Sequence, residues 1–338
     1  MTEISNFDNG ECRLGNNNPT EKLSSRFGEA KAFLNHQLIA SETLVERLLI
    51  CLLADGHILI EGAPGLAKTR SAKLLAHILG LSFARVQCTP DLMPADVTGT
   101  SAWRPDHGRF DFLPGPIFHS LLLVDEINRA PPKVQSALLE AMAEKQVTVA
   151  GETRQLPNIF MTIATQNPIE QEGTYPLPEA QLDRFMMHIN ISLPDRDAER
   201  KILDLIEDNE TSELNNKDNV ITIEDINIAR EDIKNIFLSP AVKDYIIRLV
   251  TAPRDPAFAP DLSKQILYPS SPRGTLALAS TSKARAYLNN RDYVLPEDVT
   301  ALANDVLAHR TILSWRAQSE GISSREVIAS YLDRVHPS

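Results

Sequence analysis

Eight residues decide the fold: Gly62-Ala63-Pro64-Gly65-Leu66-Ala67-Lys68-Thr69. They follow a short β-rich run at 57–60 and precede a stretch with helical periodicity at 68–79. A glycine-containing loop between a strand and a helix is the context of a phosphate-binding loop, because backbone N–H groups and the helix N-terminus face phosphate oxygens there. Lys68 would reach the β- and γ-phosphates of a nucleotide, and the Thr69 hydroxyl would bind Mg²⁺. The alternative is a Gly-Pro turn that happens to precede Lys-Thr, since Ala67 stands where a second glycine is usual.

A second pattern is the apolar run at 121–124, which ends in Asp125 and Glu126. At the carboxyl end of a strand, Asp125 would hold Mg²⁺ directly or through water, and Glu126 would orient and activate the attacking water. Taken alone, a strand that ends in Asp-Glu is often a solvated strand end. Combined with the loop at 62–69, it predicts nucleotide hydrolysis.

Three further residues are candidates for the same chemistry. Asn167 follows an apolar run at 160–165 and would hydrogen-bond the γ-phosphate or the water, with a plain Asn-Pro turn as the alternative. Arg184 precedes a strand candidate and has no evident partner in the chain, and a surface ion pair is its alternative. Arg273 opens a helix from which a guanidinium would reach back to a nucleotide held between two domains, although most helix arginines have no such role.

The chain of 338 residues divides into three predicted parts. Residues 1–26 are polar and predicted to be a flexible tail. Residues 27–195 alternate helical stretches with apolar runs, which is typical of an α/β core whose mostly parallel sheet is covered on both faces. Residues 196–338 are almost all helical in pattern, and their helix starts include Ser239-Pro240 and a capping box from Ser323 to Glu326. The strand candidates are 57–60, 83–86, 121–125, 160–165 and 186–191.

Composition excludes several classes of protein. With 43% hydrophobic and 23% charged residues, the chain is that of an ordinary globular protein, and its net charge of −11 argues against a surface built wholly for nucleic acid. No apolar run approaches the roughly 20 residues of a membrane span, and the N-terminus lacks a signal-peptide core, so no membrane partner and a cytoplasmic location are predicted. The 3 cysteines form no C-x-x-C pair, which favours neither disulfides nor structural zinc.

These elements, in this order, resemble the AAA+ ATPases, and the residues of the motifs resemble those of the MoxR family in particular. The resemblance covers about residues 33–336 and implies an α/β AAA+ P-loop NTPase core, with a five-stranded parallel sheet, plus a C-terminal all-helical lid domain. It makes 62–69 the Walker A loop that binds ATP, Asp125 and Glu126 the Walker B acids, and Asn167 sensor 1. Arg273 becomes sensor 2, and Arg184 becomes the arginine finger that acts on the neighbour's ATP. The matching phrases are Glu61-Gly-Ala-Pro-Gly-Leu-Ala-Lys-Thr69, Phe112-Leu-Pro-Gly-Pro-Ile-Phe118, Val124-Asp-Glu-Ile-Asn-Arg129, Ala164-Thr-Gln-Asn-Pro168, Tyr175-Pro-Leu-Pro-Glu-Ala-Gln-Leu-Asp-Arg-Phe185 and Ser271-Pro-Arg273.

The same resemblance implies ATP and Mg²⁺ as cofactors and a homo-oligomeric ring, usually a hexamer. Such a ring would couple ATP hydrolysis to the maturation or activation of a protein client, often a metalloenzyme complex, together with a partner that carries a von Willebrand A-type domain. Two insertions, around 99–112 and at 146–154 with a turn at Ala150-Gly151, would contact the client or are ordinary surface hairpins. The alternatives are a metal-chelatase-type or nucleic-acid-acting AAA+ motor subunit, or an ATP-binding scaffold with little turnover.

The match is incomplete at residues 34–37, Leu-Asn-His-Gln. The family usually shows a Val-Gly-Gln type of sequence there, near the adenine, and only Gln37 agrees. The contacts to the base are therefore not predicted. At Ala67, in contrast, the family also carries alanine, so this departure from the general loop pattern supports the resemblance.

Overall fold

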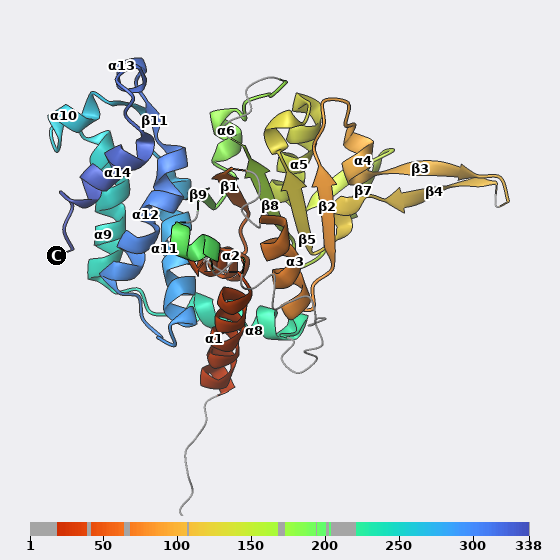
Figure 1. Ribbon diagram of the computed structural model, residues 1–338, viewed down its shortest axis with the longest axis horizontal. Coiled ribbons are helices and arrows are strands. Elements are labelled where there is room, and N and C mark those ends of the chain that lie inside the picture. Colours follow the sequence, from red (N-terminus) through yellow and green to blue (C-terminus); the bar gives the residue numbers. More distant parts are fainter. Residues whose placement is uncertain are drawn as a thin grey trace, which may run out of the picture.

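A parallel sheet of five strands forms the centre of the molecule (Figure 1), with the strand order β2-β5-β8-β1-β9. The computed structural model describes residues 19–38, 42–63, 68–106, 108–167, 173–193, 195–200, 203 and 221–337. Each strand lies within two residues of a predicted apolar run, so the predicted α/β core is confirmed. The strands are β1 (Ile58–Gly62), β2 (Phe83–Gln87), β5 (Leu121–Asp125), β8 (Met161–Gln166) and β9 (Met187–Ile191).

The three central strands, β1, β5 and β8, are buried on both faces of the sheet, to which their successive side chains point in turn. In β5, Leu121 and Leu123 belong to one apolar cluster, whereas Leu122 and Val124 belong to another. Helix α3 (Lys68–Ile78) packs in the first cluster, and α5 (Pro132–Glu144) packs in the second. Since both faces are covered there, the central strands β1, β5 and β8 are rich in apolar residues, which made them recognisable in the sequence.

The prediction of a flexible tail over residues 1–26 is wrong for residues 19–26. Helix α1 (Pro19–Gln37) includes residues 19–26, and Leu23 and Phe27 on it are only 6% and 0% exposed. Phe27 contacts the ring of Tyr287 edge-on, with the centroids 6.3 Å apart, and Arg26 forms an ion pair with Asp225 at 3.0 Å. These partners lie far away in the sequence, so local composition could not reveal them. Residues 1–18 lie outside the described part of the chain.

The C-terminal part is largely helical, as predicted, but it also contains two short strands that pair with each other. Runs this short show no alternation in a sequence, which explains why they were missed. The predicted capping box is present, because the Ser323 side chain accepts from the Glu326 N–H and the Glu326 side chain caps in return. The elements are α8 (Ile223–Asn235), α9 (Pro240–Thr251), α10 (Pro260–Ser263), β10 (Ile266–Tyr268), α11 (Pro272–Leu288), α12 (Pro296–Leu307), η5 (Ala308–Arg310), β11 (Ile312–Leu313), α13 (Trp315–Ser319) and α14 (Ser324–Leu332).

Core and lid share one hydrophobic interior. A single apolar cluster runs from α1 and α2 (Glu42–Leu53) through one face of the sheet into α9, α11, α12 and α14. The same joint contains an ion pair between the Arg47 Nε and Asp305 Oδ2 atoms, 2.9 Å apart and almost fully buried. The predicted boundary at residue 195 stays a prediction, and the polar stretch at 207–219 lies outside the described residues.

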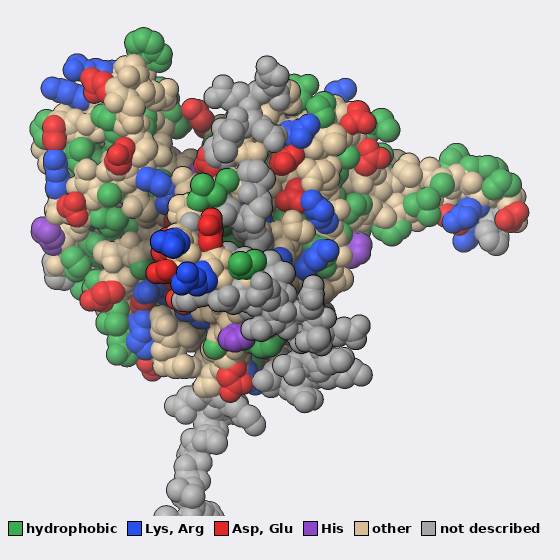
Figure 2. Space-filling model, in the orientation of Figure 1, with side chains coloured by type: hydrophobic (Ala, Val, Ile, Leu, Met, Phe, Trp, Pro, Cys, Tyr) green, Lys and Arg blue, Asp and Glu red, His purple; other side chains and the backbone are tan. Residues whose placement is uncertain are grey.

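Both predicted insertions are antiparallel hairpins. The first, β3 (Gly99–Arg104) with β4 (Arg109–Pro114), projects from the body as an arm (Figure 1). The second is β6 (Gln146–Val149) with β7 (Glu152–Gln155), and it turns at Ala150 and Gly151, which both have positive φ as a tight hairpin turn requires. Figure 2 shows acidic and basic side chains interspersed over the visible face rather than gathered by sign.

Within the part of the chain that the structure describes, no helix has the length and apolar character needed to cross a membrane. Cys51 and Cys88 are buried free thiols, whereas Cys12 lies outside the described residues. Burial raises the pKa of the Cys88 thiol to about 12.

His57 joins three elements just before β1. Its Nδ1 atom accepts from the Thr162 N–H at 3.0 Å, and its Nε2 atom lies 3.1 Å from the Met142 carbonyl oxygen, to which it donates. Both ring nitrogens are thereby satisfied in the neutral imidazole, and a second proton would have no acceptor. Burial accordingly lowers the pKa of His57 to about 4.

Acid is therefore expected to destabilise the fold through His57. The unfolded histidine has a pKa of about 6.5, so the unfolded state binds more protons as the pH falls from that value towards 4. The neutral His57 ring makes its full contribution to the free energy of unfolding above about pH 6.5. At pH 5 that free energy is lower by about 2 kcal/mol. Urea unfolding at pH 8 and pH 5 should show that the His57→Gln variant loses about 2 kcal/mol less than the parent chain between the two pH values. Equal losses in the two proteins would contradict this assignment.

Candidate active site

The phosphate-binding end of the site lies at the carboxyl edge of the sheet, where β1 ends and α3 begins. Lys68 is the first residue of α3, and its Nζ atom donates to the Gly62 carbonyl oxygen at 2.7 Å. Partial burial lowers the pKa of Lys68, while Asp125, Glu126 and Glu61 act in the opposite direction. Lys68 is thus a cation held close to the loop that precedes it. The predicted loop residues Gly62 and Ala63 are described, whereas Pro64, Gly65, Leu66 and Ala67 lie outside the described residues.

The two predicted acids lie at the same edge, at the end of β5. The Thr69 Oγ1 atom is 3.5 Å from the Asp125 Oδ2 atom, which is almost fully buried. The Thr165 hydroxyl donates to Asp125 Oδ1 at 3.1 Å and accepts from the Glu126 N–H at 3.0 Å. Thr69 and Asp125 therefore present a hydroxyl and a carboxylate to one point, a donor set that suits the hard cation Mg²⁺. Thr165 was not predicted, because only the pairing of β5 with β8 places it there.

Glu126 has an unusual backbone conformation. Its φ of 56° and ψ of 53° lie in the left-handed region, which costs a residue other than glycine roughly 1–3 kcal/mol. The hydrogen bond from its N–H to Thr165 helps to maintain this turn between β5 and η2 (Ile127–Arg129). As a result, Asp125 and Glu126 point to different partners although they are adjacent in the sequence.

The neighbouring strand β2 supplies residues that were missed. Arg85 donates from Nε to Asp125 Oδ2 at 2.6 Å, and Gln87 donates from Nε2 to Glu126 Oε2 at 3.0 Å. Arg129 also approaches this Glu126 oxygen, at 3.2 Å. The alternation of Arg85 and Gln87 in the sequence indicates only that they share one face of a strand. Their role depends on the register that places Gln87 beside Asp125, and that register is a long-range property.

Asn167 is also at the carboxyl edge. It follows directly after β8, which lies between β5 and β1, and its side chain is buried. The structure therefore brings Lys68, Thr69, Asp125, Glu126 and Asn167 to one edge of the sheet, as the sequence predicts.

Arg184 and Arg273 lie at the opposite, amino edge. Arg184 precedes β9, and its Nη1 atom donates to the Leu139 carbonyl oxygen at 2.7 Å, so the prediction that it has no partner in its own chain is wrong. Arg273 was expected to reach back to a nucleotide held between the two domains, and the structure does not bring it to the phosphate edge of its own chain. Its Nη1 atom is 3.5 Å from Asp183 Oδ2, beyond the start of strands that are about 13 Å long.

A cleft of about 480 Å³ joins these two arginines at the amino edge. Its walls come from the turn before β1, the end of α5, residues 183–186 and the first turns of α11. Four cations line it, Lys145, Arg184, Arg273 and Arg310, against the two carboxylates of Asp55 and Asp183, so cations are in excess. The sequence could not show this cleft, because helix α11 reaches it from the far end of the chain.

Comparisons with known proteins agree with this architecture. Residues 57–187 match the profile described as the ATPase family associated with various cellular activities, and residues 262–331 match the AAA lid domain. The chain is similar to Chaperone MoxR1 of Mycobacterium tuberculosis, with 41% identity over 88% of this chain and 78% of that protein. It is also similar to the uncharacterized protein YeaC of Bacillus subtilis, with 40% identity over 93% and 96% of the two chains. A crystal structure of a protein from Cytophaga hutchinsonii superimposes with a TM-score of 0.88 at 42% identity, and the match covers 94% of this chain and 97% of that one. Because relatives named MoxR match most of the chain, and because the AAA and AAA lid profiles match its two parts, the chain belongs to the MoxR family of AAA+ ATPases.

Proposed function

We propose that this protein assembles into a homo-oligomeric ring, a hexamer, and hydrolyses ATP. The energy of the hydrolysis cycle would be used to remodel a protein client. The observation that carries the proposal is the convergence of Lys68 and Thr69 with Asp125 and Glu126 at one edge of the sheet. Lys68 binds the β- and γ-phosphates, and the phosphate loop at 62–69 surrounds them. Thr69 and Asp125 would hold Mg²⁺, which would offset phosphate charge when bound.

Glu126 is the general base in this proposal. Its carboxylate takes the proton of the water that attacks the γ-phosphate, and Asn167 orients this water or the phosphate. In the structure, the Glu126 Oε2 atom accepts from Gln87 and Arg129, so the proton would go to Oε1, or to Oε2 once it has left these partners. Arg85 donates to the Asp125 oxygen that faces Thr69, so Arg85 would compete with a bound Mg²⁺ for this oxygen.

Arg184 and Arg273 act on the nucleotide of a neighbouring subunit. Both lie at the amino edge, away from the phosphate loop of their own chain, and both line one cation-rich cleft. A head-to-tail contact that places the amino edge of one subunit against the carboxyl edge of the next repeats around a closed ring. Guanidinium groups suit the charge that develops on a transferring phosphoryl group.

The client is a protein, and the β3–β4 arm is the surface that contacts it. Trp103 and Phe110 on the arm are more than half exposed and pack edge to face, with centroids 5.2 Å apart. The nearby charges are balanced, since Arg109 pairs with Asp111 at 2.9 Å. This balance favours a protein over a nucleic acid, which needs an excess of cations. We further propose that the client is a metalloenzyme complex that matures with the help of a partner carrying a von Willebrand A-type domain. The proposed location is the cytoplasm.

The first test is nucleotide binding by the Lys68→Ala variant. Loss of a charged hydrogen bond to phosphate should weaken ATP binding by about 10- to 100-fold and lower turnover accordingly. Calorimetric titration with a non-hydrolysable ATP analogue measures the affinity. Lys73→Ala, which alters an exposed residue on the same helix, is the matched control and should bind as the parent does. Unchanged affinity in Lys68→Ala would refute the assignment of the phosphate site.

A further inference from the structure

Arg310 is a buried lid residue whose contacts reach the core segment that carries Arg184. Its side chain is 3% exposed, and its Nε atom donates to Asp183 Oδ1 at 2.9 Å. The other guanidinium nitrogens donate to the carbonyl oxygens of Asp183 at 3.3 Å, Phe185 at 2.6 Å and Met186 at 3.1 Å. We call residues 183–186 the strap. Arg310 therefore binds both the side chain and the backbone of the strap.

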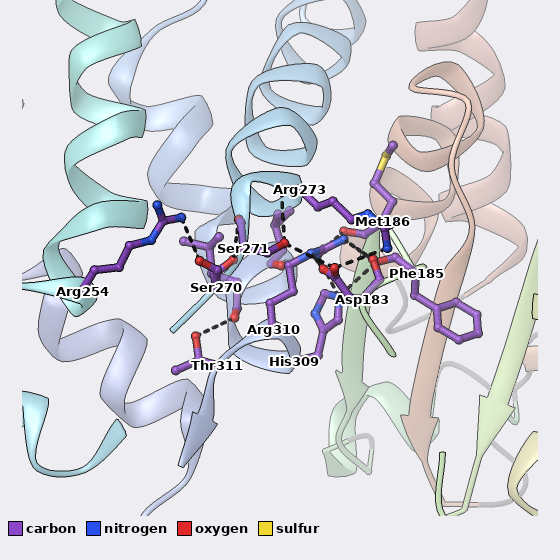
Figure 3. Close-up of polar contacts among 12 residues, drawn as sticks. Asp183, Phe185, Met186, Arg254, Ser270, Ser271, Arg273, His309, Arg310 and Thr311 are labelled. Carbon is purple, nitrogen blue, oxygen red and sulfur yellow. Dashed lines mark hydrogen bonds and ion pairs between the residues drawn. The ribbon is translucent and has the colours of Figure 1, made fainter. Parts of the chain in front are cut away.

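Asp183 connects the same strap to the start of α11. Its Oδ2 atom accepts from the Ser271 hydroxyl at 3.3 Å and lies 3.5 Å from Arg273 Nη1. Figure 3 shows Asp183 between Arg310 and Arg273, with His309 beside them. The Nε2 atom of His309 lies 3.0 Å from the Phe185 carbonyl oxygen and 2.8 Å from Arg310 Nη1, so two adjacent residues of η5 contact the strap. The Asp183 carboxylate thus contacts Arg310 and Arg273, and Asp183 is the residue directly before Arg184.

The chemistry of Arg310 suits a positioning role. A guanidinium has five N–H donors in a rigid plane, and several of them here reach acceptors that lie on one short loop. A lysine would keep the charge but would place a single flexible ammonium group there. Burial lowers the pKa of Arg310, and the Asp183 carboxylate acts in the opposite direction. Arg310 also lines the cleft, but its charge is compensated there by the Asp183 carboxylate.

We propose that Arg310 is a positioning residue for hydrolysis in the neighbouring subunit, because it fixes the strap to the lid and so directs Arg184 and Arg273 to one nucleotide. The proposal rests on the proposed function, in which these two arginines act between subunits. It assigns to the lid a part in setting the geometry of Arg184, although Arg184 belongs to the core in sequence. No contact of Arg310 with the nucleotide is required.

Rings of the Arg310→Lys variant should hydrolyse ATP about 10²-fold more slowly, since a small displacement of a catalytic group costs about this factor. The affinity for a non-hydrolysable ATP analogue should stay within about twofold of the parent, because the phosphate edge is untouched. Arg47→Lys is the matched control. Arg47 is also a nearly buried arginine between core and lid, but its side chain binds Asp305, Glu46 and the Ala301 carbonyl and not the strap. Its turnover should equal that of the parent after correction for the folded fraction.

Mixed rings separate positioning from a purely structural role. Arg310→Lys subunits, which keep an intact phosphate edge, are combined before addition of ATP with Glu126→Gln subunits, which keep an intact strap. About a quarter of the junctions in a random mixture then pair the two intact halves, and turnover should recover towards that fraction. A lesion confined to the folding or nucleotide site of the Arg310→Lys subunit would not be rescued, and absence of recovery would overturn the proposal.

A parallel mixture of Arg184→Ala with Glu126→Gln subunits tests separately whether Arg184 acts between subunits and whether Arg310 positions it. Recovery in this mixture but not with Arg310→Lys overturns the role of Arg310 alone. Absence of recovery in both mixtures overturns the action of Arg184 between subunits, and with it the premise. If Arg310→Lys does not fold, Asp183→Asn enters the same tests, because it removes the charge that Arg310, Ser271 and Arg273 share while it keeps the size of the side chain.

Discussion

Replacement of Glu126 by glutamine is expected to lower the rate of ATP turnover by about 10²–10⁴-fold while ATP remains bound. The amide has nearly the shape of the carboxylate, but it cannot accept the proton of the attacking water. The turn at residue 126 should persist, because its hydrogen bond to Thr165 uses the backbone N–H and not the side chain. Thr69, Asp125 and Lys68 also keep their positions. The variant should therefore form rings that retain ATP.

Phosphate release, nucleotide content after desalting and light scattering test this expectation together. Glu320→Gln is the matched control, because this glutamate is exposed on the lid and pairs only locally with Arg316 at 2.9 Å. The control should hydrolyse ATP at the parent rate. Undiminished hydrolysis in Glu126→Gln would show that another group activates the water, and loss of bound ATP would show that Glu126 contributes to binding.

The second large effect is expected from Arg184→Ala, which should lower turnover by about 10³–10⁵-fold, the range known for arginines supplied to a nucleotide between subunits. The loss is large because the guanidinium would stabilise charge that develops on the transferring phosphoryl group. ATP binding should be nearly unchanged, since Arg184 lies at the amino edge of its own subunit. Stability should fall by only about 1 kcal/mol, because one hydrogen bond to the Leu139 carbonyl is lost.

Single-turnover hydrolysis and analogue titration separate these quantities for Arg184→Ala. Arg316→Ala, which removes an exposed arginine of the lid, serves as the control and should retain the parent rate. A rate within threefold of the parent, about 0.7 kcal/mol, would exclude Arg184 from the reaction. A large loss of ATP affinity would instead place Arg184 at the nucleotide of its own chain, against the observed geometry.

The sheet and the phosphate edge could be predicted from the sequence because their signals are local. The central strands β1, β5 and β8 are rich in apolar residues, and the predicted site residues of the phosphate edge follow these strands: Lys68, Thr69, Asp125, Glu126 and Asn167. Parallel strands then bring their carboxyl ends together without further information. The fold class and the group of residues at the carboxyl edge could therefore be predicted from the sequence alone.

The features that were missed depend on contacts between distant segments. The start of α1 is stabilised by Tyr287 and Asp225, more than half the chain away, and the strands β10 and β11 are too short to show a pattern. Arg273 follows Ser-Pro at a helix start, which says nothing about which edge of the sheet that helix approaches. Arg85 and Gln87 look like ordinary strand residues until the register with β5 is known.

The apolar cluster that runs through α1, α2, the sheet and the lid has a mechanical consequence. A hinge between the two halves of a subunit would have to open a dry interior, at about 25 cal/mol for each Å² of apolar surface exposed. Relative rotation within one chain is therefore costly, whereas the amino edge and the carboxyl edge meet only where two chains touch. In the proposed ring, each subunit would therefore move as a stiff body, and the motion driven by ATP hydrolysis would take place at the junctions between subunits.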